Sequence, residues 1–154
     1  MTALHHVCIG MFGLIAGFFY AYSVSAMPGL GAVDPNAAIE AMRGINVAVL
    51  NPVFFATFFV TPVLALIAGG LRLRAGSRAA GMLLLAAALV YILGAMGPTS
   101  IVNVPMNEAL AMAEIVDPAV EWSAYSRDWT LANHARTVAS LTALGLTSEA
   151  LRRT

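Results

Sequence analysis

Residues 129–148 read WTLANHARTVASLTALGLTS and decide the fold, because this apolar segment can cross a membrane only if it takes a charge with it. The uncharged run 137–148 has only 12 residues, whereas a membrane-spanning helix needs about 20 at a rise of about 1.5 Å per residue. Extending the run back to the start of the segment restores the length and places Asn133, His134 and Arg136 below the membrane surface. A charge at that depth costs about 2.5 kcal/mol or more, which by default marks a functional site.

The composition independently predicts an integral membrane protein. Of the 154 residues, 60% are hydrophobic and 10% are charged, and the mean hydropathy is +0.82. A soluble domain of this size cannot bury so much apolar surface. Besides the segment above, three uncharged stretches are long enough to cross a membrane, at 7–26, 44–71 and 79–107. We therefore predict an all-α fold with a single membrane domain over residues 1–154. Its core is a bundle of four spanning helices, at about 5–26, 52–71, 79–99 and 129–148.

The charges predict how this bundle is oriented. Five of the eight basic residues lie in the link 72–78 and the tail 152–153. Because positive charge favours the cytoplasmic side, both termini are predicted in the cytoplasm of a bacterial-type plasma membrane. Seven of the eight acidic residues then fall on the opposite side. The formal net charge of zero argues against a nucleic-acid partner and leaves the lipid bilayer as the expected surroundings.

The two external segments, residues 27–51 and 100–128, carry signals of short helices that cap the bundle. Asp34-Pro35 and Asp117-Pro118 have the pattern of a helix N-terminus, and Asn51-Pro52 is expected to end the first capping helix. The tetrapeptide MPGL, residues 27–30, is expected to turn the chain after the first span.

Polar residues of the last segment share one helical face. On a helix that turns by about 100° per residue, Trp129, Asn133, Arg136 and Ser140 follow the spacing i, i+4, i+7, i+11. They form a polar stripe that faces into the bundle, with His134 at its edge.

Arg136 has two alternative environments. Its side chain can reach back to the outer headgroups. Alternatively, it forms a buried ion pair, for which Glu108 and Asp128 are the candidate partners.

The motif NVPMN, residues 103–107, forms a second polar group. Its proline is expected to interrupt the helix, and irregular backbone survives in a membrane only inside protein or beside a wet cavity. Asn103 and Asn107 either repair this break or bind a substrate, and the residues favour neither alternative. Asn46 is a third buried polar candidate near the external entrance of the second span. Together these positions predict one outward-facing pocket for a hydrophobic small molecule.

The sequence contains no motif for a metal or cofactor. The single Cys8 excludes a cysteine cluster, and there is no phosphate-binding glycine loop, nucleophile elbow or paired-histidine helix. No cofactor and no metal are predicted. Gly13 and Gly17 are expected to pack against neighbouring helices of the bundle, and a homo-oligomer is left open.

Taken together, these motifs resemble those of the DUF1772, or anthrone oxygenase-like, membrane proteins. The similarity covers nearly the whole chain, and its two main motifs, Asn-x-Pro-x-Asn and Trp-x-x-x-Asn-His-x-Arg, are specific only in combination. The stretches that carry it are AYSVSAMPGL at 21–30, AMRGIN at 41–46, NVPMN at 103–107 and WTLANHAR at 129–136.

The resemblance implies a small four-helix membrane protein, some of whose fungal relatives oxidise anthrones to anthraquinones without a metal or flavin. An anthrone loses a proton to give an electron-rich anthrolate that reacts with oxygen directly. The site must therefore bind a flat apolar molecule, take up a proton and stabilise an oxyanion. The implied roles are general base for His134, anion stabilisation for Arg136, ring stacking for Trp129, and contacts to substrate oxygens for Asn103, Asn107 and Asn133.

Two classes of function follow. The first is a cofactor-independent oxygenase that acts on a hydrophobic aromatic substrate, either anthrone-like or phenolic. The alternative is a non-catalytic membrane protein that binds a lipid, a quinone or a protein partner through its external polar pocket. Replacement of His134 by glutamine separates them, because only the first class loses turnover. Transport is a weaker third hypothesis, since the chain shows no inverted repeat.

Overall fold

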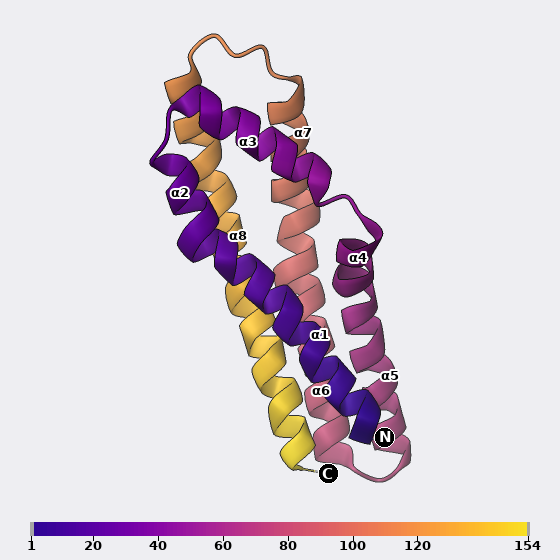
Figure 1. Ribbon diagram of the computed structural model, residues 1–154. Coiled ribbons are helices and arrows are strands. Elements are labelled where there is room, and N and C mark those ends of the chain that lie inside the picture. Colours follow the sequence, from indigo (N-terminus) through magenta and orange to yellow (C-terminus); the bar gives the residue numbers. More distant parts are fainter. Residues whose placement is uncertain (1, 154) are drawn as a thin grey trace.

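The computed structural model describes residues 2–153, and within that range the fold is all-α and contains no strand (Figure 1). Most of the helical segments join end to end into long helices. α1 (Thr2–Ala21) continues through the π-helical segment η1 (Tyr22–Ala26) into α2 (Met27–Gly31). α4 (Pro52–Phe55), η2 (Ala56–Val60) and α5 (Thr61–Arg74) form a second long helix. The third comprises α6 (Arg78–Tyr91), η3 (Ile92–Met96), η4 (Thr99–Asn103) and α7 (Val104–Met112). Two helices remain separate, α3 (Pro35–Ala48) and the 35-residue α8 (Pro118–Arg152).

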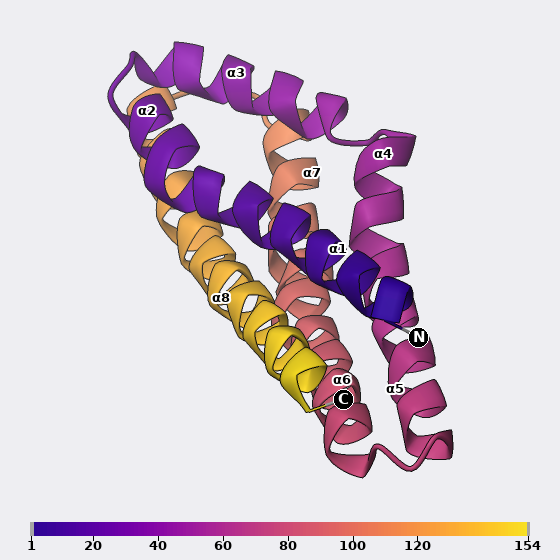
Figure 2. The ribbon, with the colours of Figure 1, turned by 60° about the horizontal axis from the view of Figure 1, so that its bottom comes forward.

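The long helices pack side by side, as Figures 1 and 2 show from two directions. α1 packs against α5 and α8, and α6 packs against the same two helices from the other side. α3 lies across one end of the molecule and packs against α7 and α8. Both chain termini and the α5–α6 turn lie at the opposite end. The external capping helix predicted after the first span therefore exists as α3.

Three of the helices are long and apolar enough to cross a membrane. They are Thr2–Gly31, Pro52–Arg74 and Arg78–Met112, and they include the first three predicted spans. α8 is not among them, because its polar stripe lowers its hydropathy. The fourth predicted span, 129–148, stays a prediction.

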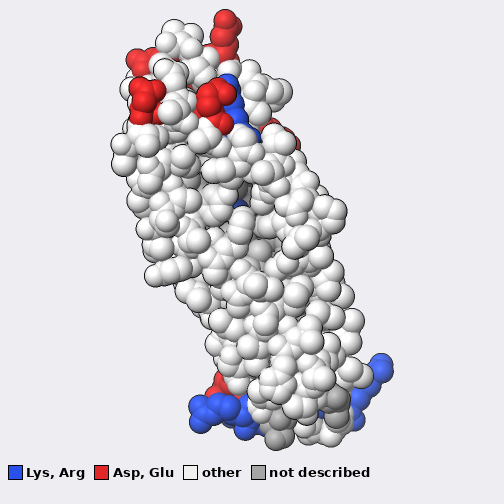
Figure 3. All heavy atoms as spheres, in the orientation of Figure 1, with Lys and Arg blue, Asp and Glu red and all other residues white. Residues whose placement is uncertain are grey.

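The two ends of the molecule carry opposite charges. Most arginines gather at the end that holds the termini, together with Glu149, and most aspartates and glutamates gather at the end covered by α3, together with Arg43; the surface between the two ends is almost free of charge on the face shown (Figure 3). This separation is the one expected from the charge pattern of the sequence, and it orients the molecule along an axis suited to a bilayer.

Prolines sit inside the long helices without ending them. Each of the four π-helical segments is followed by a proline two residues after its last residue, at Pro28, Pro62, Pro98 and Pro105. A proline has no N–H and its ring collides with the carbonyl four residues earlier, and a wider π turn just before it relieves both problems. The predicted turn at 27–30 and the predicted interruption at Pro105 are therefore wrong, since the chain stays helical through both.

One carbonyl released by a proline has a dedicated partner. Pro62 cannot donate to the carbonyl of Phe58, and the Tyr91 hydroxyl donates to that oxygen at 3.1 Å. Tyr91 is fully buried and its ring packs edge-on against Phe58 and Phe12. This hydrogen bond joins η2 of the second long helix to α6 of the third.

The predicted helix starts are present. Asp34 accepts hydrogen bonds from the backbone N–H groups of Asn36 and Ala37 at the start of α3. Asn51 does the same at the start of α4, and Asp117 at the start of α8. Each satisfies backbone donors that a helix leaves free in its first turn.

Glycine permits close helix contacts at other positions than the sequence indicated. A Cβ atom on Gly94 would lie 2.5 Å from the Cβ of Ala139 in α8, and one on Gly69 would lie 3.1 Å from the carbonyl oxygen of Gly81. A Cβ on Gly13 or Gly17 would meet nothing within 4 Å. The expectation that these two glycines pack within the bundle is wrong, because they lie on the outer side of α1.

Gly94 gives a direct test of the contact between the third long helix and α8. We expect Gly94→Ala to lower the unfolding free energy by about 1–3 kcal/mol, because the methyl group must displace α8. Gly97→Ala is the matched control, since its Cβ would meet only the Ile92 carbonyl at 3.7 Å. It should be neutral or slightly stabilising. Thermal melts of both variants in the same detergent would contradict the contact if the two shifts were equal.

Candidate functional site

A cavity of about 360 Å³ lies in the wider half of the molecule, beneath α3. We call it the Arg136 cavity. Its walls come from α1, α3, the α4–η2 helix, the η4–α7 helix and α8. Three of the four π-helical segments contribute lining residues: Tyr22 in η1, Phe58 and Phe59 in η2, and Thr99, Ser100 and Asn103 in η4. The widened turns therefore shape this cavity.

Arg136 is held in the cavity wall by neutral groups. Only 5% of the residue is exposed. Its Nη2 donates to Oδ1 of Asn133 at 2.8 Å and its Nη1 to Oγ1 of Thr99 at 3.3 Å. Its guanidinium carbon lies 4.6 Å from the ring centre of Phe19 and 4.9 Å from that of Trp129. Ring faces attract a cation, but none of these partners carries the opposite charge.

Neither environment expected for Arg136 is present. Among the ion pairs of residues 2–153, Asp128 bonds its neighbour Arg127 at 2.8 Å instead, because both side chains project into solvent. The hydrogen bond from Arg127 lowers the pKa of the Asp128 carboxyl below its usual value. Glu108 lines the cavity but forms no ion pair with Arg136 in this part of the chain. Burial also excludes a side chain that reaches the headgroups.

Three buried polar atoms in the cavity lining have no hydrogen-bond partner among the described residues. They are Nε of Arg136, Nδ2 of Asn46 and Oδ1 of Asn103. The Asn103 amide is oriented unambiguously, since its Nδ2 donates to the Trp129 carbonyl at 3.1 Å. An unmet buried polar group costs about 1–3 kcal/mol. Two donors and one acceptor around one space therefore match a ligand that presents oxygen atoms, at least one of them acting as an acceptor.

Asn107 positions the aromatic part of the site. Its Oδ1 accepts hydrogen bonds from the Tyr125 hydroxyl and from Nε1 of Trp129, both at 2.8 Å. The indole is thereby fixed against Arg136 on one side and against the Tyr22 ring, 5.4 Å away between centres, on another. Asn107 acts here as a support for Trp129.

Asn133 lies directly behind Arg136 and is fully buried. Its Nδ2 donates to the Phe19 carbonyl at 2.9 Å and to Oγ of Ser23 at 2.8 Å. Ser23 in turn lies 2.9 Å from Nδ1 of His134. His134 is exposed and faces a separate shallow groove on the outside of η1 and α8. It is thus connected to Arg136 only through Ser23 and Asn133.

The structure brings five of the seven predicted site residues to one cavity: Asn46, Asn103, Asn107, Trp129 and Arg136. Asn133 supports this group from behind, and His134 lies outside it. Sequence reasoning missed Thr99, Ser23 and the phenylalanines of α4 and η2. Ser23 lies within the stretch 21–30 that carries the family resemblance, which is the one signal that could have identified it.

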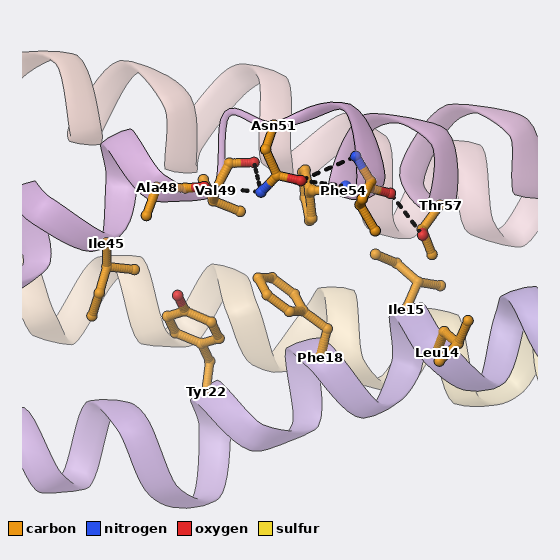
Figure 4. Close-up of a pocket in the computed structure, with 11 residues that line it drawn as sticks. Leu14, Ile15, Phe18, Tyr22, Ile45, Ala48, Val49, Asn51, Phe54 and Thr57 are labelled. Atoms are coloured by element: carbon orange, nitrogen blue, oxygen red, sulfur yellow. Dashed lines mark hydrogen bonds between the residues drawn. The ribbon is translucent and has the colours of Figure 1, made fainter.

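A second hollow of about 450 Å³ lies between α1 and the start of α4, and Figure 4 shows its lining. We call it the α1–α4 groove. It has no charged lining residue. The Asn51 side chain is hydrogen-bonded to the backbone, since its Nδ2 donates to the Ala48 carbonyl and its Oδ1 accepts from the N–H groups of Val53 and Phe54. Thr57 likewise donates to the Val53 carbonyl. This groove is larger than the Arg136 cavity, but it has no buried polar side-chain atom without a partner, so it suits mainly apolar occupants.

Within residues 2–153, no three side chains of His, Cys, Asp or Glu come close enough together to hold a metal ion. The polar lining of the Arg136 cavity is instead made of amides, hydroxyls, the Trp129 indole, the guanidinium groups of Arg43 and Arg136, and one carboxylate, Glu108. Such groups bind oxygen atoms of an organic molecule.

Fold and site thus define an all-α protein with membrane-capable helices and a buried cation in an aromatic cavity. The family model described as Anthrone oxygenase matches residues 45–146, a range that contains all seven predicted site residues. The chain belongs to the anthrone oxygenase family. No curated protein and no solved structure matches it. α1, which supplies Phe18, and η1, which supplies Tyr22 and Ser23, lie outside the matched range.

The support of Trp129 by Asn107 can be tested by substitution. Asn107→Leu leaves two buried donors without an acceptor, and we expect it to cost about 2–4 kcal/mol of unfolding free energy. Tyr125→Phe removes one donor and leaves none unpaired, so its cost should stay near 1 kcal/mol. Thermal melts in detergent give the comparison. Equal losses for the two variants would contradict the role assigned to Asn107.

Proposed function

We propose that the protein is an integral membrane protein in which α8 forms a fourth span beside the three apolar helices. Its polar residues Asn133, Arg136 and Ser140 are buried against the other helices, so the bilayer meets mainly its apolar side. The arginine-rich end and both termini lie on the cytoplasmic side, which places the Arg136 cavity in the outer half of the membrane.

We propose further that the cavity binds a flat aromatic molecule whose oxygen is ionised, as in an anthrolate or phenolate. The observation that carries this proposal is the unpaired, buried Arg136 with a free Nε, near a second unmet donor, Nδ2 of Asn46. The free Oδ1 of Asn103 can accept a hydrogen bond from a further hydroxyl group of the ligand. Phenylalanine rings and Trp129 supply the apolar walls. A desolvated cation stabilises a negative oxygen far more than water does.

Family membership supports oxygenation as the reaction. Loss of a proton from the ring CH2 of an anthrone gives the anthrolate, whose oxygen Arg136 stabilises. O2 takes the electron pair at that carbon, and the resulting peroxide is protonated to a hydroperoxide. Loss of water, with the remaining hydrogen of that carbon, then leaves the quinone carbonyl. One oxygen atom ends in the product and the other in water, so no further reductant is needed.

Glu108 is the better placed of two candidate bases. It is the one carboxylate among the described residues that line the cavity, on its exposed rim. His134, which the family resemblance implies as the base, lies outside and acts on the cavity only by holding Ser23 and Asn133. We therefore assign proton removal to Glu108 and a positioning role to His134.

The binding proposal is tested with 2-naphthol, a fluorescent phenol, on the protein in lipid nanodiscs. Binding should strengthen as the pH rises through the pKa of the naphthol itself, since the cavity favours the anion. Arg136→Gln should weaken binding of the anion about tenfold to a hundredfold and remove this pH dependence, because a hydrogen bond to a charged group contributes about 1.5–3 kcal/mol.

Arg127→Gln is the matched control for that experiment. It removes an arginine from the same helix at an exposed position, where the side chain pairs with Asp128. Its affinity for the naphthol should equal that of the wild type. Equal losses in both variants would show that total charge, and not the cavity cation, controls binding, and would overturn the proposal.

Turnover of an anthrone, corrected for its spontaneous oxidation, separates the two candidate bases. We expect Glu108→Gln to lower turnover about a hundredfold or more, the usual contribution of a general base, with little change in naphthol affinity. His134→Gln should lower turnover less than tenfold, since it acts through two intervening residues. The reverse order would restore His134 as the base, and naphthol binding with no turnover in the wild type would leave a non-catalytic binding protein.

A further inference from the structure

The Arg136 cavity opens sideways, between the two membrane-capable helices that contain α4–η2 and η4–α7. Phe55 and Phe59 form one side of the opening and are 40% and 50% exposed. Val104 lies on the other side and is 41% exposed. Both helices are long and apolar enough to span a membrane. An opening between them faces the lipid, and we call it the lateral window.

The same cavity is roofed on the side of the acidic end. α3 lies over it, and Arg43 fastens α3 to the end of α7. Nε and Nη2 of Arg43 donate to the Leu110 carbonyl at 3.0 and 2.9 Å, and Nη2 also donates to the Ala113 carbonyl at 2.9 Å. These carbonyls belong to the end of a helix, where a cation is favoured. α3 is thus fixed to α7 by a specific contact, whereas no side-chain hydrogen bond or ion pair among the described residues joins Phe55 or Phe59 to Val104 across the window.

Charge is distributed along the cavity in a way that favours entry of a neutral molecule from the lipid. Arg136 lies deep inside and the rim of the window is apolar, while Glu108 is the acidic group at the outer rim. An anion that approached from the aqueous side would meet this carboxylate and Arg43, whose guanidinium is already engaged by the Leu110 and Ala113 carbonyls and by Glu40. A neutral phenol or anthrone dissolved in the bilayer meets phenylalanine and valine side chains and the hydroxyl of Ser100.

The α1–α4 groove does not offer an equivalent route. It shares Phe18, Tyr22 and Phe54 with the Arg136 cavity, and these rings form the wall between the two spaces. The centre of the Phe18 ring lies 5.2 Å from that of Phe54 and 5.1 Å from that of Tyr22. Figure 4 shows Phe18 projecting from α1 toward the start of α4, and Tyr22 projecting from η1 toward Ala48 and Val49 at the end of α3. A molecule in the groove is separated from Arg136 by this packed aromatic wall.

We propose that the lateral window is the entrance through which an aromatic amphiphile passes from the bilayer into the Arg136 cavity. The molecule enters as its neutral form with the oxygen-bearing edge first, and any apolar substituent on the opposite edge stays in the window or the lipid. This inference rests on the proposed ligand class but concerns its route and orientation.

The test mixes 6-alkyl-2-naphthols, which partition into the bilayer, with vesicles that contain the protein, and follows association by stopped-flow fluorescence excited outside the tryptophan band. Protein-free vesicles give the rate of partitioning alone. Val104→Trp places a large ring in the window, and we expect association and dissociation both to slow about tenfold or more, with the equilibrium affinity nearly unchanged. Ile101→Trp is the matched control, because Ile101 is 76% exposed in the same helix but does not line the cavity. It should react at the wild-type rate.

A second measurement covers the case in which Val104→Trp does not fold. Ser100→Phe narrows the same rim and should also slow both rates. In addition, the alkyl chain can be lengthened from one carbon to nine. The dissociation constant, expressed as the naphthol concentration in the membrane, should stay unchanged, because the chain lies outside the cavity. A steep loss of affinity with chain length would overturn the proposed orientation.

The outcomes separate this inference from the proposed function. Unchanged rates in the rim variants, together with Arg136-dependent binding, would overturn the window and leave the binding proposal intact. Failure of wild-type protein to bind any naphthol, or binding that is indifferent to Arg136→Gln, would overturn the proposed function itself.

Discussion

The rest of the structure depends on one constraint. A positive charge is buried in the wall of an apolar helix assembly without a negative partner. A lone buried cation is costly unless dipoles and ring faces surround it. Arg136 receives these from Asn133, Thr99 and two aromatic rings, and each support is itself fixed. Asn133 has both amide hydrogens engaged on the first helix, and Trp129 is held by Asn107. The arginine is therefore oriented firmly but not neutralised.

The cavity around this cation is shaped by π-helical turns, each of which is followed by a proline. A π turn interrupts the regular hydrogen-bond ladder and is generally found where function requires it. Here the widened turns carry Tyr22, Thr99 and Asn103 to the cavity, and regular α-helix resumes at the prolines Pro28, Pro62 and Pro105. Where this leaves a carbonyl inside the protein, a donor compensates, as Tyr91 does for Phe58.

Helical periodicity was sufficient to predict which residues of the last helix are buried. Trp129, Asn133 and Arg136 share the expected face and are almost fully inaccessible. The same spacing could not place His134 relative to the cavity, because one residue step rotates a side chain by about 100° and so turns it toward a different space. Nor could it reveal Ser23, which is 110 residues away from Asn133 in the chain. The long helices were predictable from apolar runs, but the turn expected at Pro28 and the interruption expected at Pro105 were wrong, because a π turn precedes each of these prolines.

The missing counter-ion of Arg136 and the apolar window are two aspects of one arrangement. A carboxylate beside Arg136 would neutralise the charge and occupy its free donor, and the cavity would then bind neutral molecules best. The other arginine of the lining, Arg43, is engaged by the Leu110 and Ala113 carbonyls and by Glu40, so Arg136 is the cation with a free donor. Under the proposed function, a neutral aromatic molecule leaves the lipid, reaches Arg136 and loses its proton there. The ligand then becomes charged only beside Arg136. The unpaired arginine raises the free energy of the empty protein, and ionisation of the ligand beside it relieves this free energy, which favours loss of the proton.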